Sequence, residues 1–328
     1  MQIIAVPPGS SRISDVVGLG REAAALDHPW LPMESERQFG ALLTHGWDGQ
    51  PARCFAGLED GRVLVYGNLW TPIYDNPHYA EFEIVVHPDR RRRGLGSQVL
   101  RRLEETARAE QRPRAHLLGI ESAPFDTFAL HHGYRPGYRE VVREQDLTDL
   151  PPGWRDLLDE TEQGAAADYE LLYLTGRLPD DLIDQMPALW TQINDAPTHG
   201  LDLDDEVFDV ARLRAYEAAQ QAAGATIHRV IARHRPTGEL SGHTIVAVEG
   251  DDPSRGHQHD TTVGRAHRGH RLGFVLKATM MVRLLRSEPR LRTIDTWNAE
   301  DNDHMIAVNQ TLGYRVKAVQ AYYRRRLA

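Results

Sequence analysis

The strongest constraint on the fold of this chain is an internal repeat, which relates its two halves at low identity. Residues 86–96 read VHPDRRRRGLG and residues 263–273 read VGRAHRGHRLG; each segment has Arg five residues after Val and closes with Leu-Gly. Downstream, LHHGYR around Gly133 recurs as QTLGYR around Gly313. A motif set that recurs at nearly constant separation predicts one structural unit used twice.

The length of the chain agrees with a duplicated unit. At 328 residues with 41% hydrophobic content, it exceeds the usual size of one domain, roughly 100–200 residues. We predict an N-terminal domain over residues 1–150 and a C-terminal domain over residues 168–328. Residues 151–167 are rich in Pro, Gly and acidic side chains, which predicts a linker with a boundary near residue 160.

Hydrophobic periodicity and turn residues give both halves the same order of elements. A short strand precedes two helical stretches, a hairpin, an alternating strand, a helix, another strand, a short helix and a final strand pair. In the first half the hairpin turns at residues 59–61, the alternating strand is 78–86 and the helix is 96–109. The sequence therefore predicts an α/β fold of the mixed-sheet (α+β) kind, as two consecutive domains whose central sheets are flanked by helices.

Charge and composition argue against several classes of function. The formal net charge of -9 disfavours nucleic-acid binding, and the basic run at residues 90–93 is too short to reverse that. No apolar run approaches the ~20 residues that cross a bilayer, and the N-terminus lacks a secretion signal, so we expect a cytoplasmic protein without membrane partners. The single cysteine, Cys54, cannot form an internal disulfide, which fits a reducing compartment.

The first repeated motif predicts an anion-binding cradle. A strand leads through a glycine-bearing loop into a helix, which gathers backbone N–H groups and the positive helix terminus at one point. Flanking guanidinium groups can neutralise phosphate charge, and a serine hydroxyl lies in the first helical turn. The cradle residues are Arg91, Arg92, Arg93, Gly94, Leu95, Gly96 and Ser97.

The spacing Arg-x-x-Gly-x-Gly after Val-x-Pro resembles the acyl-CoA motif of the GNAT superfamily of N-acetyltransferases. The second half is similar to the tandem GNAT proteins of actinobacterial type, distantly like the mycothiol synthases. That likeness rests on residues 267–273, Leu276-Lys277, residues 296–302, Met305, Asn309 and residues 312–314.

This resemblance implies acetyl-CoA, or another acyl-CoA, as the cofactor. Beyond the cradle, it implies contacts from strand ends, from the second loop and from asparagine amides. These residues are Ile84, Val85, Val86, Thr262, Val263, Arg268, Gly269, His270, Arg271, Leu272, Gly273, Asn298, Asn302 and Asn309. For Asn298 and Asn302, helix caps and turns are the alternative.

The second half departs from the family pattern at two places. Arg271 stands where the first loop glycine would be, which weakens the expectation of close diphosphate approach there. The family's usual acid, a tyrosine four residues before the Gly-Tyr pair, is replaced by Ala129 in the first half and Asn309 in the second. Neither half has the expected proton donor.

Amide formation calls for a base, because an alkylamine with a pKa of ~10.4 is protonated at neutral pH. His257 and His259 lie two apart on a predicted strand and share a face, and a related acetyltransferase has a His-x-His pair on the matching strand. Glu81 and Glu83 are the candidates in the first half, but they have the opposite parity relative to the loop, so a bulge is needed to turn them toward a cleft. Solvent-exposed strand positions are the alternative for both pairs.

A metal site is a further alternative for four histidines: His257, His259, His267 and His270. A His-x-His pair on a strand can chelate, but no carboxylate or cysteine cluster completes a ligand set. We therefore predict no metal.

The function these patterns predict is acetyl transfer from acetyl-CoA to a primary amine of a small molecule, by direct attack on the thioester. A catalytically degenerate CoA-binding sensor or scaffold, and a peptide or protein N-acetyltransferase, remain alternatives. We expect the chemistry in the second half and the acceptor pocket to involve residues 21–45 and 182–223. A monomer and a homodimer are both compatible with the sequence.

Overall fold

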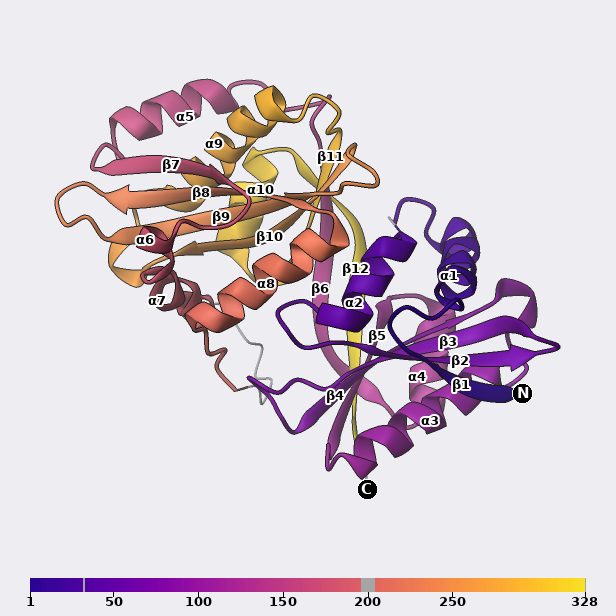
Figure 1. The fold of residues 1–328 in the computed structure, drawn as a ribbon. Helices are drawn as coiled ribbons and strands as arrows, with labels where there is room; N and C mark the ends of the chain where they lie inside the picture. The colour runs from indigo at the N-terminus through magenta and orange to yellow at the C-terminus, as the bar shows by residue number, and fades with distance from the viewer. Residues whose placement is uncertain (32, 196–203, 328) are drawn as a thin grey trace. The chain divides into compact units, whose positions relative to one another are not determined.

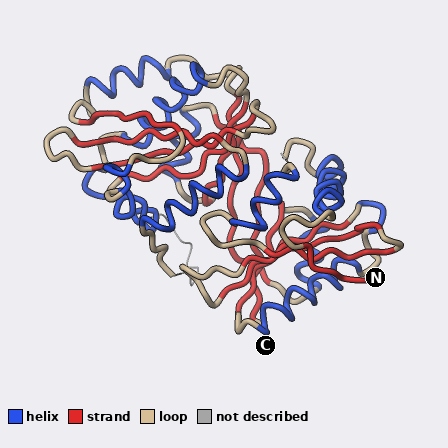
Figure 2. Tube along the Cα trace, in the orientation of Figure 1, coloured by secondary structure: helices blue, strands red, loops and turns tan. Residues whose placement is uncertain are grey.

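The computed structural model describes residues 1–31, 33–195 and 204–327, and divides into two compact units (Figure 1). Unit 1 contains residues 1–139 and the C-terminal segment from Gln320; unit 2 contains most of the chain from Glu140 to Val319. In each unit a mixed sheet carries helices on its faces, as the red strands and blue helices of Figure 2 show. The predicted fold class is confirmed.

Unit 1 follows the predicted order of elements. They are β1 (Gln2–Val6), α1 (Ile13–Asp27), α2 (Glu36–His45), β2 (Arg53–Glu59), β3 (Arg62–Trp70), β4 (Tyr79–Val86), the 3₁₀ turn Pro88–Arg90, α3 (Leu95–Ala109), β5 (Arg114–Ile120), α4 (Ala123–His131), the start of β6 (Arg135–Asp146) and the end of β12 (Tyr314–Arg326). The strand order is β1-β2-β3-β4-β5-β12-β6, with β4 and β5 parallel.

Local sequence explains the ends of these elements. Ser35 begins α2 with a capping box, in which its hydroxyl accepts from Gln38 N and the Gln38 side chain accepts from Ser35 N. Asp60 and Gly61 both have positive φ, 50° and 78°, so they form the tight turn between β2 and β3 that Asp-Gly favours. Helices α1 and α2 pack on one face of the sheet, and α3 and α4 pack on the other.

Unit 2 repeats this order with two additional helices, one before its first strand and one between its first two strands. Its elements are α5 (Trp154–Gln163), β7 (Tyr169–Thr175), α6 (Asp180–Ile183), α7 (Met186–Trp190), the 3₁₀ turn Thr191–Asp195, α8 (Val210–Ala223), β8 (Thr226–His234), β9 (Leu240–Val248), β10 (Arg255–Val263), the 3₁₀ turn Arg265–His267, α9 (Leu272–Ser287), β11 (Thr293–Ala299) and α10 (Asp303–Thr311). The strand order is β12-β6-β11-β10-β9-β8-β7, with β10 and β11 parallel. Part of the predicted acceptor region, residues 196–203, lies outside the described residues.

The expected linker over residues 151–167 instead contains helix α5. Trp154 and Leu158 are buried in the core of unit 2, beside residues of α9. Their helical spacing buries an apolar stripe even though the rest of the segment is acidic and contains Pro and Gly. Overall composition therefore gave a misleading indication for this segment.

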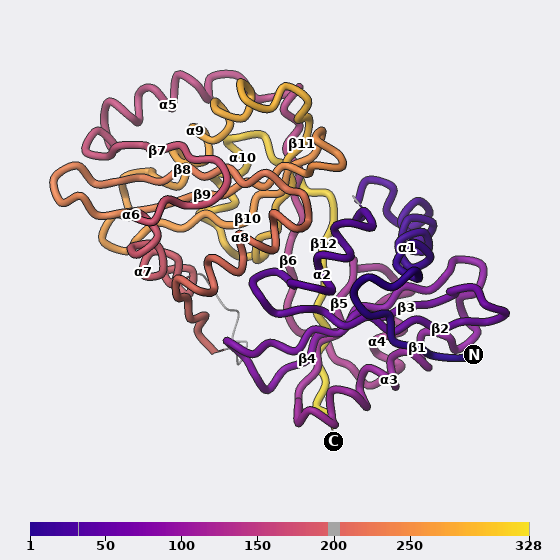
Figure 3. The backbone as a smooth tube through the Cα atoms, in the orientation of Figure 1, coloured from indigo at the N-terminus to yellow at the C-terminus, as the bar shows by residue number. Residues whose placement is uncertain are grey.

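The final strands also differ from the predicted domain boundaries. Each half ends in one long strand, β6 or β12, rather than a strand pair, and both can be followed in Figure 3. The end of β12 pairs with β5 of unit 1, from Gln320 opposite Ile120 to Arg326 opposite Arg114. The end of β6 pairs with β11 of unit 2, from Glu140 opposite Ala299 to Asp146 opposite Thr293. Each sheet thus incorporates a strand from the sequence of the other half.

Within the described part of the chain, none of the helices combines the length and the apolar character that a membrane crossing requires.

The exchanged strand makes the last residues of the chain part of the core of unit 1. Tyr323 is 8% exposed and its ring meets Phe125 edge-on, at 5.5 Å between centroids. We predict that Tyr323→Ala lowers the free energy of unfolding by about 3 kcal/mol, measured by urea titration, because it leaves a cavity. Val316→Ala, an exposed position on β12, is the control and should change the free energy by less than about 0.5 kcal/mol. An equal midpoint for both variants would contradict the assignment.

Candidate active site

Both repeated motifs lie at strand-to-helix junctions with the same backbone. In unit 1, β4 leads through Arg92 (φ 61°) and Gly94 (φ 77°) into α3; in unit 2, β10 leads through Gly269 (φ 88°) and Arg271 (φ 57°) into α9. Each loop fills one left-handed position with Gly and the other with Arg. Arg271 therefore takes up the conformation required at the position of the missing glycine, at a cost of about 1–2 kcal/mol.

No side chain caps the first-turn backbone N–H groups of α3 and α9, so these groups can bind a ligand. Gly94 and Arg271 are the N-cap residues, and neither supplies a side-chain cap. Unsatisfied N–H groups and the positive end of the helix dipole favour an anion at such a terminus. The backbone of Leu95, Gly96 and Ser97 in unit 1, and of Leu272 and Gly273 in unit 2, can therefore hold a phosphate.

One arginine of each loop bonds to protein groups and holds the loop in place, and is not free to bind phosphate. Arg91 donates to both carboxylate oxygens of Asp27, at 2.8 and 2.5 Å, and its Nε donates to Val86 O at 3.3 Å. Arg268 repeats the arrangement, with Nη2 donating to Asp195 at 2.7 Å and Nε to Val263 O at 3.4 Å. This corrects the expectation that Arg91 and Arg268 neutralise phosphate charge.

The other side chains of the two loops differ in whether they have protein partners. Arg92, Arg93 and Arg271 are exposed, and among the described residues none of them forms an ion pair. Ser97 Oγ lies 2.8 Å from His132 Nε2, and His270 Nδ1 lies 3.0 Å from the carbonyl of Ala165. Arg92 and Arg93 in unit 1 and Arg271 in unit 2 are therefore loop guanidinium groups that no described carboxylate engages.

The parallel strands beside each loop separate before they end. β4 pairs with β5 only from Tyr79 to Phe82, and β10 pairs with β11 only from Arg255 to His257. The rest of β4, including Ile84, Val85 and Val86, and the rest of β10, including Thr262 and Val263, have no strand partner on that side within the described residues. Apart from Val86 O and Val263 O, which accept from Arg91 and Arg268, their backbone groups line an opening in each sheet that leads to the phosphate cradle.

A β-bulge in β10 resolves the parity problem of the base candidates. The register between β10 and β9 shifts between Gln258 and Thr261, whereas β4 pairs with β3 without a shift. The extra residue makes His257 equivalent to Glu81 and His259 equivalent to Glu83. Both pairs therefore occupy the same face, and His259 and Glu83 lie just beyond the end of parallel pairing.

His257 is held by two carboxylates. Its Nε2 lies 2.5 Å from Glu249 and its Nδ1 lies 2.7 Å from Asp295. Burial alone would lower the pKa of His257, but these carboxylates raise it to about 10. A charged imidazole with both nitrogens engaged cannot accept a proton, so the expectation of His257 as a base does not fit this geometry.

His259 has the opposite character. Burial lowers the pKa of His259 well below its usual value, and the charge of His257 lowers it further. Tyr216 Oη lies 2.6 Å from its Nδ1, and Tyr216 packs edge-on against Trp190. His259 is therefore a neutral imidazole beside an aromatic wall formed by α7 and α8.

Glu83 is the corresponding group of unit 1. Burial raises its pKa, although a hydrogen bond from Asn68 Nδ2 at 3.1 Å acts against that. Burial, together with the neighbouring Glu83, also raises the pKa of Tyr66 and brings that of Cys54 to about 12. Glu81 instead lies 3.6 Å from His116 Nδ1, in an ion-pair geometry.

The asparagines of unit 2 serve different purposes. Asn302 caps α10 by accepting from Met305 N at 3.2 Å, as the alternative interpretation expected. Asn309 is fully buried and bonds to Lys277 and Asn298, so it has an internal role in place of the expected contact with the cofactor. The sequence signal for Lys277 was a cation between apolar neighbours, Leu276 and Ala278, in the first half of α9. Ala129, the equivalent of Asn309, is buried in the core of unit 1.

The alternative metal set is dispersed. His267 bonds to Tyr169 and His270 to Ala165 O, while His257 and His259 engage different partners. Among the described residues, no group of three or more His, Cys, Asp or Glu side chains is arranged to hold a metal ion.

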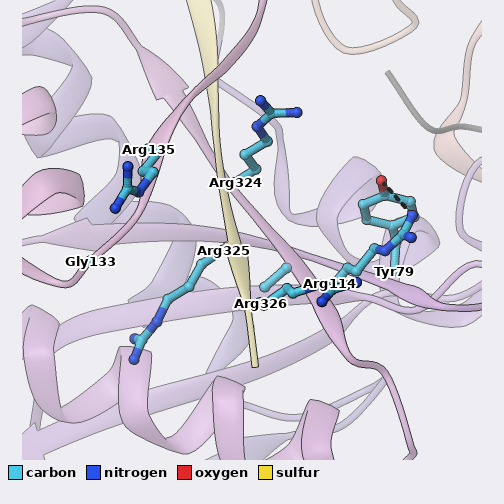
Figure 4. A pocket seen from close by; sticks show the side chains of 8 residues that line it. Tyr79, Arg114, Gly133, Arg135, Arg324, Arg325 and Arg326 are labelled. Atoms are coloured by element: carbon cyan, nitrogen blue, oxygen red, sulfur yellow. Dashed lines mark hydrogen bonds between the residues drawn. The ribbon is translucent and has the colours of Figure 1, made fainter. Parts of the chain in front are cut away.

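A pocket of unit 1 lies apart from these residues (Figure 4). Five arginines line it, together with Tyr79, Ala115 and Gly133; they are Arg114, Arg135, Arg324, Arg325 and Arg326. Tyr79 and Arg114 begin β4 and β5, so this pocket is at the opposite end of those strands from the phosphate cradle. None of the predicted site residues lines it.

Comparison with known proteins places this geometry in a family context. Residues 22–131 match the acetyltransferase (GNAT) family. A mycothiol acetyltransferase of Thermomonospora curvata is 41% identical over 105 residues, which is 32% of this chain and 32% of that protein. The match thus spans about a third of the length of that relative.

Solved structures share the fold of the whole chain. A tandem GNAT protein from the clavulanic acid biosynthesis pathway superposes with a TM-score of 0.81 at 23% identity, covering 100% of this chain and 98% of that one. A GCN5-related N-acetyltransferase from Sphaerobacter thermophilus has a TM-score of 0.67 at 18% identity, covering 99% and 96%. The tandem arrangement inferred from the internal repeat is confirmed.

The two carboxylates that hold His257, those of Glu249 and Asp295, predict that the free energy of unfolding depends on pH. The folded pKa is raised, so the stabilisation is complete below about pH 6.5, the unfolded value, and is lost as the pH rises toward 10. His257→Gln leaves two buried carboxylates unpaired and should cost about 3 kcal/mol at pH 6.5 in urea unfolding. The difference from wild type should shrink by pH 10. A difference independent of pH would show that His257 is not charged in the fold.

The loop backbone predicts opposite effects for two glycines. Gly94→Ala should cost about 1 kcal/mol of stability because its φ is positive. Gly273→Ala should gain about 0.5–1 kcal/mol, because Gly273 is helical and an added Cβ meets no protein atom within 4 Å. The same methyl group should weaken acyl-CoA binding, measured by calorimetry. Unchanged affinity in Gly273→Ala would remove the second loop as a phosphate site.

Proposed function

We propose that this protein transfers an acetyl group from acetyl-CoA to a primary amine of a small molecule. Its residues 22–131 match the GNAT acetyltransferase family, and its fold is that of a tandem GNAT protein. The observation that carries this proposal recurs in both units: parallel strands open beside a phosphate cradle, and a desolvated base candidate lies where the opening begins. A base that acts on an acyl-CoA thioester could use these three features together.

The residues present suit acyl-CoA. The uncapped amides at the start of α3 and α9 and the exposed arginines fit a diphosphate, while the free edges of β4 and β10 offer hydrogen bonds to an extended amide-bearing arm. Bound acetyl-CoA would supply the activated acetyl group as a thioester. A strand N–H beside the opening can donate to the oxygen on which negative charge develops during attack.

His259 and Glu83 are the proposed proton acceptors. Amine attack forms the C–N bond and breaks the C–S bond, and the amine proton must leave. A neutral imidazole can accept that proton on one ring nitrogen, and a carboxylate with a raised pKa is a better base than an ordinary one. Desolvation moves both groups toward the neutral form, from opposite starting charges.

We favour unit 2 as the catalytic unit. Tyr216 meets the ring of His259 and packs against Trp190, which stacks on Phe208; this row of aromatic rings suits the apolar part of a small acceptor. The partial match to a mycothiol acetyltransferase, whose name specifies a small-molecule acceptor, supports the same substrate class.

A CoA-binding sensor is the second candidate, favoured by one observation. The position of the family's usual tyrosine acid holds Ala129 in one unit and Asn309 in the other, so a phenol is missing from both. Tight binding of acetyl-CoA without thiol release from any amine would support the sensor and overturn the enzymatic proposal.

The proposed bases can be separated by matched variants. Thiol release from acetyl-CoA is followed with a panel of small amines, and acetyl-CoA affinity is measured by calorimetry. His259→Asn should lower kcat by about 10²–10⁴-fold with unchanged acetyl-CoA affinity, whereas Glu83→Gln should have little effect. His304→Asn, at an exposed position of α10, is the control. The reverse pattern would move the chemistry to unit 1.

A further inference from the structure

Unit 2 contains a buried lysine that has no role in the reaction described above. Lys277 of α9 is 2% exposed, and in the part of the chain that the structure describes no carboxylate pairs with it. Its Nζ donates to Asn309 Oδ1 at 2.6 Å and lies 4.6 Å from the centre of the Tyr314 ring. An ammonium group that is buried with only an amide and an aromatic face is costly unless its charge is used.

The surroundings of Lys277 contain buried polar groups that the described residues leave unsatisfied. Arg143 of β6 is 5% exposed, and its buried Nη1 has no hydrogen-bond partner among those residues; the buried Oε1 of Gln145 has none either. Burial, then the charge of Arg143, lowers the pKa of Lys277 to about 7. Asp295, whose charge acts on Tyr314, is already paired with His257. The charge of Lys277 is therefore not balanced by a carboxylate of its own.

Hydrogen bonding gives the cluster a direction. An ammonium group can only donate, so Asn309 must turn its Oδ1 toward Lys277. Asn309 Nδ2 then donates to Asn298 Oδ1 at 2.7 Å. Asn298 in turn keeps its Nδ2 as a donor, with no protein acceptor among the described residues. Asn298 is partly exposed on β11, three residues beyond Asp295, within the opening between β10 and β11.

The repeat shows that the fold does not need this chain of polar groups. The residues of unit 1 at the equivalent positions are Leu100 for Lys277, Ala129 for Asn309 and Gly119 for Asn298. The same helix-on-sheet packing is therefore built from apolar groups in unit 1. A polar chain that one copy omits points to a function specific to unit 2.

We propose that Lys277 is a positioning residue. Through Asn309 it fixes the side-chain amide of Asn298 so that Asn298 Nδ2 is directed toward the opening. There Nδ2 donates a hydrogen bond to an acceptor oxygen of the acyl-CoA thioester arm. This proposal rests on the proposed function. It adds that Lys277, which does not touch the cofactor, controls how unit 2 recognises the cofactor.

The charge state of Lys277 should control this recognition. While Lys277 is protonated the direction of both amides is fixed; once it is neutral it can accept as well as donate, and the amides are free to reverse. Acyl-CoA binding in unit 2 should therefore weaken as the pH rises above about 7. By linkage, a bound acceptor should raise the pKa of Lys277.

Only two lysines occur in the chain, so lysine labelled with ¹³C at Cε gives two NMR signals. Lys317, which pairs with Glu144 at 2.8 Å, is the internal control. In the full-length protein, Lys277 should titrate near pH 7, and acetyl-CoA should raise its pKa by about half a unit or more. Lys317 should not move. Heat of acetyl-CoA binding with an unmoved Lys277 signal would overturn this proposal and leave the proposed function standing; absence of any binding heat would defeat the proposed function itself.

Variants test the directional chain independently. The indole ¹⁵N–¹H signal of Trp297, the neighbour of Asn298, reports occupancy of unit 2. Lys277→Met and Asn298→Ala should each raise the acetyl-CoA Kd about tenfold, and the double variant should be no worse than either, because both remove one coupled interaction. Lys277→Gln, a neutral side chain that can accept as well as donate, should bind acetyl-CoA no more tightly than the wild type does above about pH 7, and its affinity should not depend on pH. Lys317→Met is the control. Additive effects, or a Lys277→Gln variant that keeps the pH dependence of the wild type, would contradict the chain.

Discussion

The early end of parallel pairing is the constraint on which the rest of the site depends. In each unit, four or fewer residue pairs join the two parallel strands before they separate, so backbone groups that a regular sheet would satisfy remain free beside a helix terminus. That one departure from regular pairing creates the opening, aims it at the phosphate cradle and places His259 or Glu83 at its start. The backbone thus sets the positions at which the catalytic proposal needs its side chains.

The two copies have diverged mainly in polar groups around a common backbone. The left-handed loop positions exchange Gly and Arg, and the base position exchanges Glu83 for His259 across a bulge. Desolvation favours the neutral form of both groups, which for the carboxyl means a raised pKa and for the imidazole a lowered one. Unit 2 adds the chain from Lys277 to Asn298 where unit 1 is apolar. The two units thus share a backbone arrangement and differ in the electrostatics of their sites.

Local patterns predicted the repeat, the order of elements and both junctions, because hydrophobic period and glycine placement act over a few residues. Long-range pairing could not be predicted in this way. Asp27 and Asp195 hold the loop arginines from 64 and 73 residues away in sequence. Glu249 and Asp295 turn His257 from a base candidate into a fixed cation. The bulge at Gln258 depends on register with β9, and α5 is stabilised by α9 in spite of its acidic composition. Each feature that could not be predicted from the sequence depends on a partner that is distant along the chain.

The exchanged strand β12 has a consequence for biosynthesis. Residues Gln320–Arg326, which complete the sheet of unit 1 beside β5, are translated about 200 residues after Ile120. At ~5–20 residues per second, the edge of β5 waits roughly 10–40 s for its partner. An unpaired strand edge is prone to associate with other chains during such a delay. Unit 1 begins first, but its sheet is completed only after Arg326 has left the ribosome, later than Val319 of unit 2.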